Sequence, residues 1–213
     1  LALSGAKDTV AVTVTDALTN GNIADLNTLK GKTQGVVTVD GISATAAQVA
    51  TLSTDTSDAV TMTASGDSTV AEAIALVEHT NALAKITIAD ISDGQNNVSG
   101  AGIASNATGL ATLKTLVGGS PTTATAIDSL YGRVSGDVTI SDGALTVDNA
   151  ISIATFTVGS GNSAISYTIS DSAGHSAGTG DDIGVATTKA SPNQSQVDVA
   201  IANATTVLAT GTL

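Results

Sequence analysis

The sequence predicts a β-rich α+β fold, in which an N-terminal, solenoid-like array of strands and helices is followed by an antiparallel β meander. Three observations lead to this prediction. A four-residue phrase, apolar-Thr-apolar followed by a small or polar residue, occurs eight times, starting at residues 12, 37, 60, 86, 138, 145, 156 and 167. The first four copies start 25, 23 and 26 residues apart, whereas the last four start only 7, 11 and 11 residues apart. The apolar content of 42% is enough for a folded core.

Each phrase is predicted to be a half-buried β-strand, because apolar and polar residues alternate and many of them are β-branched. The near-constant period of the first four copies indicates stacked units of strand and helix. We therefore expect the strands that start at Val12, Val37, Val60 and Ile86 to be neighbours in one sheet. The predicted regions are a strand-helix repeat over residues 1–118 and, over residues 119–213, a second region of one helix and an antiparallel meander with a terminal helix or strand.

Short helices are predicted between the strands of the first region. Ile23, Leu26 and Leu29 lie three residues apart and form one helical face, which ends before Gly31. The next helix is expected to use Ser43 as its cap and to run through residues 46–52.

The third helix has the clearest start signal. Thr69 and Glu72 have the spacing of a capping box, and Val70, Ile74 and Val77 form its apolar face.

Two further helices are predicted between the fourth and fifth phrases. One contains Leu110, Leu113 and Leu116, and the other is expected to start with Ser120 as cap and Pro121 in its first turn. In the second helix we expect Ile127, Leu130 and Tyr131 to point inward. The 52 residues between Ile86 and Val138 are twice 26, so one strand of the repeat is expected to be replaced by helix.

The second region is predicted to be an antiparallel meander, because its phrases are close together and Asp142-Gly143 and Gly159-Ser160-Gly161 lie between them. Residues 172–182 form a Gly/Ser/Asp-rich loop. The remaining tail has two interpretations: Val197, Val199 and Ile201 alternate as in a strand, and a helix starting near Ser191 is also consistent. We favour the helix.

Charge and composition exclude several function classes. The chain has 7 basic and 19 acidic residues and a net charge of −12, which disfavours binding to nucleic acid. It has no Cys, so a disulfide or a Cys-based zinc site is excluded. No run of about 18 apolar residues occurs, so membrane insertion is not expected. A first residue other than Met favours an exported or excised chain.

Aspartates near turns are candidate calcium ligands, because Ca²⁺ prefers six to eight oxygen ligands. The candidates are Asp90, Asp93, Asp137, Asp142, Asp181 and Asp182. Neither the spaced five-ligand calcium loop nor the Gly-Gly-x-Gly-x-Asp repeat is present. The alternative interpretation is that these aspartates, several of them beside glycine, only form turns.

The phrases Val12–Asp16, Ile23–Leu29, Ala46–Leu52 and Ile169–Ala173 resemble the strand-repeat modules of giant secreted cell-surface proteins of marine cyanobacteria and other Gram-negative bacteria. This resemblance implies secretion, a place at the cell surface or in an extracellular fibre or layer, and often a dependence on calcium. It implies no catalytic residues.

We do not expect an enzyme, because the two histidines, His79 and His175, have no acidic residue at metal-ligand spacing and no Gly-x-Ser-x-Gly elbow appears in the context of a strand followed by a helix. The expected function is self-association of copies of this chain into an extracellular fibre or surface layer. The apolar, nearly uncharged ends, residues 1–3 and 207–213, favour such contacts. The alternative is an adhesin or a phage-fibre-like module that binds a cell surface or glycan. The scarcity of aromatic residues weakens that alternative.

Overall fold

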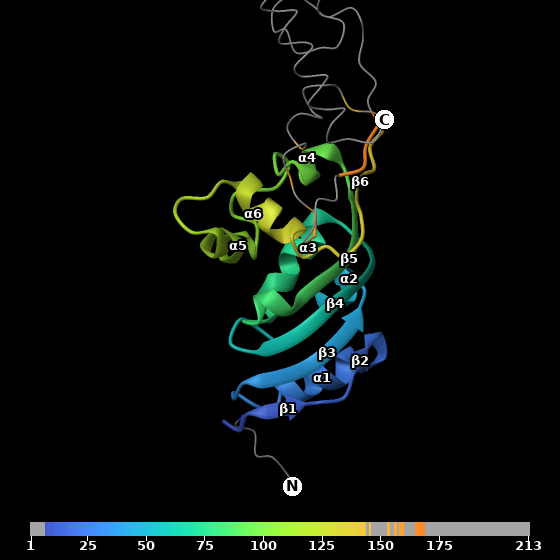
Figure 1. Cartoon of the computed structure of the whole chain (residues 1–213). Helices are drawn as coiled ribbons and strands as arrows, with labels where there is room; N and C mark the ends of the chain where they lie inside the picture. The colour runs from blue at the N-terminus through green and yellow to red at the C-terminus, as the bar shows by residue number, and fades with distance from the viewer. Residues whose placement is uncertain are drawn as a thin grey trace, which may run out of the picture.

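The protein contains one parallel β-sheet backed by helices. The computed structural model describes residues 7–143, 145, 153, 156, 158–159 and 165–168. Its strands are β1 (Val12–Val14), β2 (Leu18–Thr19), β3 (Val37–Ala44), β4 (Ala59–Ser68), β5 (Ile86–Asp93) and β6 (Val138–Ile140). They lie in the order β1-β3-β4-β5-β6, and β2 also pairs with β3 (Figure 1). Every pairing between these strands is parallel.

The prediction that the first four phrases form neighbouring strands is confirmed. Val12 of β1 is opposite Val37 of β3, and Val39 of β3 is opposite Val60 of β4. Met62 of β4 is opposite Ile86 of β5. We call each of these strands, with the segment that leads into it, a rung. The rungs follow one another in space in the same order as in the sequence.

The predicted fold class is wrong. The chain has an α/β fold with a parallel sheet, rather than a β-rich α+β fold with an antiparallel meander. The Val138 phrase forms β6, which pairs in parallel with β5, and the bridge between Thr139 and Ser166 is parallel as well. The alternation of apolar and polar residues determines which side of a strand is buried, but it carries no information about strand direction. Short spacing between phrases was therefore misinterpreted as hairpin spacing.

Several predictions fall outside the described residues. They concern most of the meander between residues 144 and 170, the loop 172–182, the helix or strand of the tail, and the two apolar ends of the chain.

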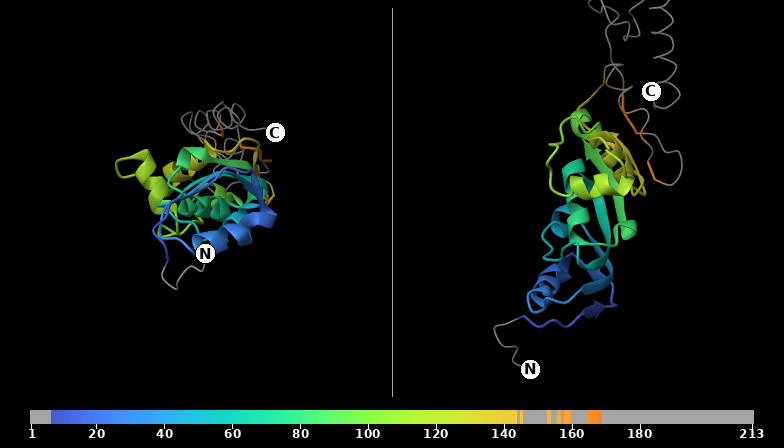
Figure 2. Two further views of the ribbon diagram at one scale, coloured as in Figure 1. Left: turned by 90° about the horizontal axis from the view of Figure 1, so that it is seen from below. Right: turned by 90° about the vertical axis from the view of Figure 1, so that its left-hand side faces the viewer.

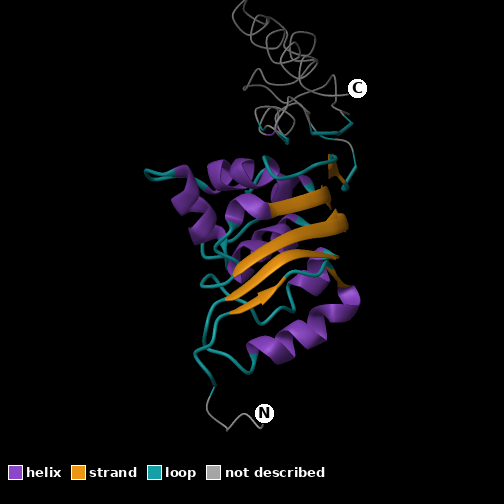
Figure 3. Ribbon diagram, turned by 60° about the horizontal axis from the view of Figure 1, so that its bottom comes forward, coloured by secondary structure: helices purple, strands orange, loops and turns teal. Residues whose placement is uncertain are grey.

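Helices connect the strands and pack against one side of the sheet (Figure 3). They are α1 (Ile23–Lys30), α2 (Ala46–Val49), α3 (Val70–Ala75), α4 (Gln95–Val98), α5 (Leu110–Val117) and α6 (Thr123–Tyr131). Shorter 3₁₀ turns are η1 (Asn20–Asn22), η2 (Leu76–His79) and η3 (Leu83–Lys85).

The residues that cap the helices can be compared one by one with those predicted from the sequence. The Thr69–Glu72 capping box at α3 is confirmed, and α1 ends at Gly31 as predicted. The cap of α2 is Thr45 rather than Ser43, because β3 continues through Ala44. The cap of α6 is Thr122, so the prediction of Ser120 and Pro121 at its start is wrong.

The crossover from β5 to β6 is much longer than the others and holds α4, α5 and α6 (Figure 1). Ile127, Leu130 and Tyr131 are fully buried, as predicted for α6. The hydroxyl of Tyr131 donates a hydrogen bond to the backbone oxygen of Val98, which ties α6 to α4. Phe156 packs edge-on against the Tyr131 ring with centroids 5.6 Å apart. The extra length of this crossover is therefore occupied by helices, where the sequence predicted helix in place of a strand.

The two sides of the sheet differ in chemistry. The side toward the helices carries buried aliphatic residues such as Val37, Val60 and Ile88, which belong to one continuous core. The other side carries the threonines of the phrases, which are half-buried or exposed. Figure 2 shows the strands as one wall of an elongated array, with helices stacked behind it. Among the described residues, β1 is the strand at one end of this sheet.

Candidate assembly surface

A buried polar residue precedes each of three successive strands. Thr33 lies before β3, Asp58 before β4 and Thr80 before η3 and β5. Their exposed fractions are 4%, 0% and 0%. We call these three residues the polar ladder. A buried polar side chain lowers stability unless its hydrogen-bonding groups are satisfied, so their partners decide what these residues do.

Asp58 links the second and third rungs. One carboxylate oxygen accepts the N–H of Val37, at the start of β3, at 2.8 Å, and the other accepts the N–H of Asp55 at 2.9 Å. The ammonium of Lys30, on α1, lies 2.8 Å and 2.7 Å from these two oxygens. The charge of the buried carboxylate is thus balanced by a nearly buried cation. Lys30 also lies 3.6 Å from a carboxylate oxygen of Asp55, whose pKa is lowered chiefly by hydrogen bonds from Ser57.

Thr80, in the fourth rung, also accepts a backbone N–H of the preceding rung, but through an uncharged hydroxyl. Its hydroxyl oxygen accepts the N–H of Val60, at the start of β4, at 2.8 Å, and the N–H of Ala82 at 3.0 Å. Asp58 and Thr80 therefore each cap an N–H group at the start of the strand in the preceding rung.

Thr33 connects the second rung to the first. Its hydroxyl contacts the backbone oxygen of Val10 and accepts the N–H of Gly35 at 2.8 Å. A Cβ atom at Gly35 would overlap the backbone oxygen of Val10, so only glycine fits where the two rungs come this close.

Asp8 holds the corresponding position in the first rung. It forms a parallel bridge with Thr33, and its backbone oxygen accepts the N–H of Gln34 at 2.6 Å. The backbone oxygen of Asp58 accepts the N–H of Asn81 in the same way, at 2.7 Å. Unlike the three members of the polar ladder, Asp8 is exposed. The difference arises because no rung precedes it within the described part of the chain.

The outer side of β1 is an open sheet edge. The N–H of Val12 donates to the backbone oxygen of Val36 at 2.9 Å, toward β3. Since successive N–H groups in a strand point to opposite sides, the N–H of Thr13 points away from β3. Among the described residues, no strand pairs with that side of β1. Such an edge offers free donors and acceptors to another chain.

The apolar residues of this edge are incompletely covered. Val12, Val14 and Leu18 are only half-buried, whereas the residues opposite them in β3 are buried. Val10 is 64% exposed and Val36 is 43% exposed. We call the outer side of residues 8–19, with Val36, the open edge. It combines unpaired backbone groups with apolar side chains.

Four of the aspartates predicted as calcium ligands lie in the described residues, and three of them bind backbone N–H groups. A carboxylate oxygen of Asp90 accepts the N–H of Asp137 at 2.8 Å. Asp93 accepts the N–H of Val70, the first residue of α3, at 2.9 Å. Asp142 accepts the N–H of Gln95, the first residue of α4, at 3.0 Å. These contacts suit the alternative interpretation, in which the aspartates hold turns and cap helices.

Within residues 7–143 and the few described positions beyond them, no three His, Cys, Asp or Glu side chains form a group able to hold a metal ion. Asp181 and Asp182 lie outside the described residues. Calcium binding therefore stays a prediction from the sequence.

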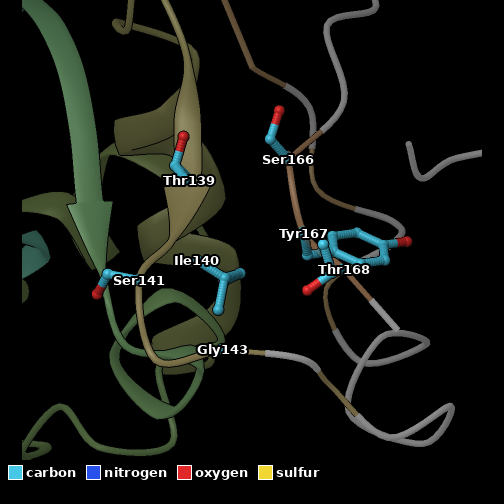
Figure 4. Close-up of a pocket in the computed structure, with 7 residues that line it drawn as sticks. All are labelled: Thr139, Ile140, Ser141, Gly143, Ser166, Tyr167 and Thr168. Carbon is cyan, nitrogen blue, oxygen red and sulfur yellow. The ribbon is translucent and has the colours of Figure 1, made fainter. Parts of the chain in front are cut away.

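A cavity of about 470 Å³ lies between β6 and the segment 165–168 (Figure 4). It is lined by Thr139, Ile140, Ser141, Gly143, Ser166, Tyr167 and Thr168. Its lining offers hydroxyl groups and one tyrosine, which can bind a polar ligand by hydrogen bonds. None of these seven side chains is charged.

The polar ladder and Asp8 were missed by the sequence analysis, although a signal was present. Asp8, Thr33, Asp58 and Thr80 are 25, 25 and 22 residues apart, close to the period of the strand phrases. The period of the array thus extends to the residues ahead of each phrase.

No protein-family model, curated protein or solved structure matches this chain. None of the helices in the described residues combines the length and the apolar character needed to cross a membrane.

Proposed function

We propose that this chain is an extracellular structural protein whose copies stack end to end into a fibre or layer. The observation that carries the proposal is the open edge of β1, with its free backbone groups and its exposed Val10 and Val36. The extracellular location rests on the resemblance to secreted surface proteins. The proposal includes no enzymatic activity.

The partner that fits the open edge best is another rung of the same chain. Within the molecule, every rung from β1 to β5 is covered by the next through parallel pairing and apolar contact. A strand from a second copy can cover β1 by the same two interactions. Contact between two different surfaces of one chain does not close into a dimer and continues as a filament.

Charge supports main-chain pairing and apolar burial as the source of affinity. With a net charge of −12, two copies repel each other on average. Only 7 basic residues are available for ion pairs between copies, and Lys30 is already paired inside the fold. Burial of apolar area contributes about 25 cal/mol per Å², and strand pairing supplies direction.

The test compares two proline variants. Thr13→Pro removes an N–H group from the open edge, while the bond from Val12 to β3 stays intact. The control is Ser105→Pro, which places proline at the second position of the exposed turn 104–107, where it is well tolerated. Light scattering across a concentration series and electron microscopy measure assembly, and circular dichroism confirms folding.

We expect wild type and Ser105→Pro to form growing particles or filaments, and Thr13→Pro to stay monomeric and folded. A wild-type chain that remains monomeric at all concentrations would contradict the proposal. Assembly of Thr13→Pro at the wild-type concentration would show that the open edge is not the contact.

The second candidate function is binding of a cell-surface glycan, and the observation that favours it is the hydroxyl-lined cavity beside β6. Thr139→Val and Ser166→Ala each remove a hydroxyl from its lining. Binding to a panel of immobilised polysaccharides that falls in both variants would support this candidate. Unchanged binding, or no binding by wild type, would remove it.

A further inference from the structure

We propose that Asp8 caps an N–H group at the start of the strand that a second copy places against the open edge, and so determines the alignment of successive copies. This inference rests on the proposed function. It adds to the proposed function one residue, Asp8, whose carboxylate is the hydrogen-bond acceptor at the contact between copies.

The argument starts from the repeated geometry inside the molecule. Asp58 accepts the N–H of Val37, and Thr80 accepts the N–H of Val60. In both cases the acceptor belongs to one rung and the capped N–H belongs to the rung before it. This capping occurs at two of the three junctions between described rungs. At the third junction, the Thr33 hydroxyl contacts the backbone oxygen of Val10 instead.

Asp8 has the same backbone relationship to the second rung that Asp58 has to the fourth rung. Its backbone oxygen accepts the N–H of Gln34, as that of Asp58 accepts the N–H of Asn81. Applying the same rule, the Asp8 side chain should cap a strand that lies before β1. A second copy docked on the open edge supplies that strand.

The residue types of the polar ladder predict the effect of substitutions at Asp8. Its interior members are threonine or aspartate, and the only carboxylate among them, Asp58, is neutralised by Lys30. A hydroxyl needs no counter-ion when it is buried, whereas a carboxylate without a cation is costly to bury. Asp8→Thr should therefore assemble at least as well as wild type, and Asp8→Ala should assemble less well.

The control is Asp25→Ala, which removes one negative charge from an exposed residue on α1 and leaves the open edge unchanged. This control separates the lost acceptor from the weaker repulsion between copies. Leaving a buried N–H without a partner corresponds to an increase of about tenfold in the concentration needed for assembly.

The experiment measures the concentration at half-assembly by light scattering for wild type, Asp8→Ala, Asp8→Thr and Asp25→Ala. We expect it to rise about tenfold in Asp8→Ala relative to Asp25→Ala, and to be equal or lower in Asp8→Thr. Equal values for Asp8→Ala and Asp25→Ala, with wild type assembling, overturn this inference alone. A fall in monomer stability in Asp8→Ala without a change in assembly also overturns it, because the cap is then within one chain. No assembly by wild type overturns the proposed function and this inference together.

Discussion

The first rung and the interior rungs are built from the same sequence phrase but lie in different surroundings. In the interior, Val37 and Val60 are fully buried, and Asp58 and Thr80 bind N–H groups of the preceding rung. In the first rung Val12 is half-buried and Asp8 is exposed. One pattern thus produces a closed core where another rung precedes the strand, and an open edge at β1, before which the described residues include no other rung.

This difference is the basis of the proposed assembly. Capping residues and apolar side chains stabilise the interior rungs. The open edge exposes the same kinds of residue, which we propose bind a second copy. Substitutions at matched positions should therefore affect stability in the interior and assembly at the edge.

The sharpest test of this comparison is the same substitution at Asp58 and at Asp8. We expect Asp58→Ala to lower the free energy of unfolding by about 3 kcal/mol, because Lys30 and the N–H of Val37 lose their buried partner. Asp8→Ala, at an exposed position, should change it by less than about 0.5 kcal/mol in the monomer. Urea unfolding followed by circular dichroism at low concentration measures both.

If Asp58→Ala does not fold, Asp58→Asn preserves the shape of the side chain and supplies the comparison. Equal losses at Asp58 and Asp8 would contradict the distinction between interior and edge.

A smaller loss is expected at Thr80, where the ladder is uncharged. Thr80→Val keeps the shape of the side chain but removes the acceptor of the N–H groups of Val60 and Ala82. We expect a loss of about 2 kcal/mol in the free energy of unfolding. Thr80→Ser keeps the hydroxyl and serves as the control. A valine variant as stable as the serine variant would show that the hydroxyl contributes nothing.

Salt should have the smallest effect, and its direction is informative. Raising NaCl from about 0.05 M to about 0.5 M shortens the range of charge repulsion to a few ångströms. Because each copy carries a net charge of −12, assembly should then begin at a concentration a few times lower. Light scattering at each salt concentration measures this. Assemblies that dissolve as salt rises would indicate ion pairs between copies and contradict pairing by backbone and apolar groups.

The sequence predicted the repeat and the order of its first strands because the alternation in each phrase is local. The capping box at Thr69 and Glu72 was also local and was predicted correctly. Strand direction was not predictable in this way, since the Val138 phrase has the same alternation in a parallel or an antiparallel pair. The partner of Asp58 was not predictable either, because Lys30 lies 28 residues away on a helix of another rung. The candidate site was missed because it depends on such contacts between rungs.

The most direct measurement of the open edge is residue-resolved amide hydrogen exchange of β1 in dilute and concentrated solution. The N–H of Val12 is bound to β3 and provides an internal reference, whereas the N–H of Thr13 points to the open edge. We predict that Val12 is protected at both concentrations and that Thr13 becomes protected only when copies assemble. Fast exchange at Thr13 in samples that light scattering shows to be assembled would contradict the pairing of a second copy with β1.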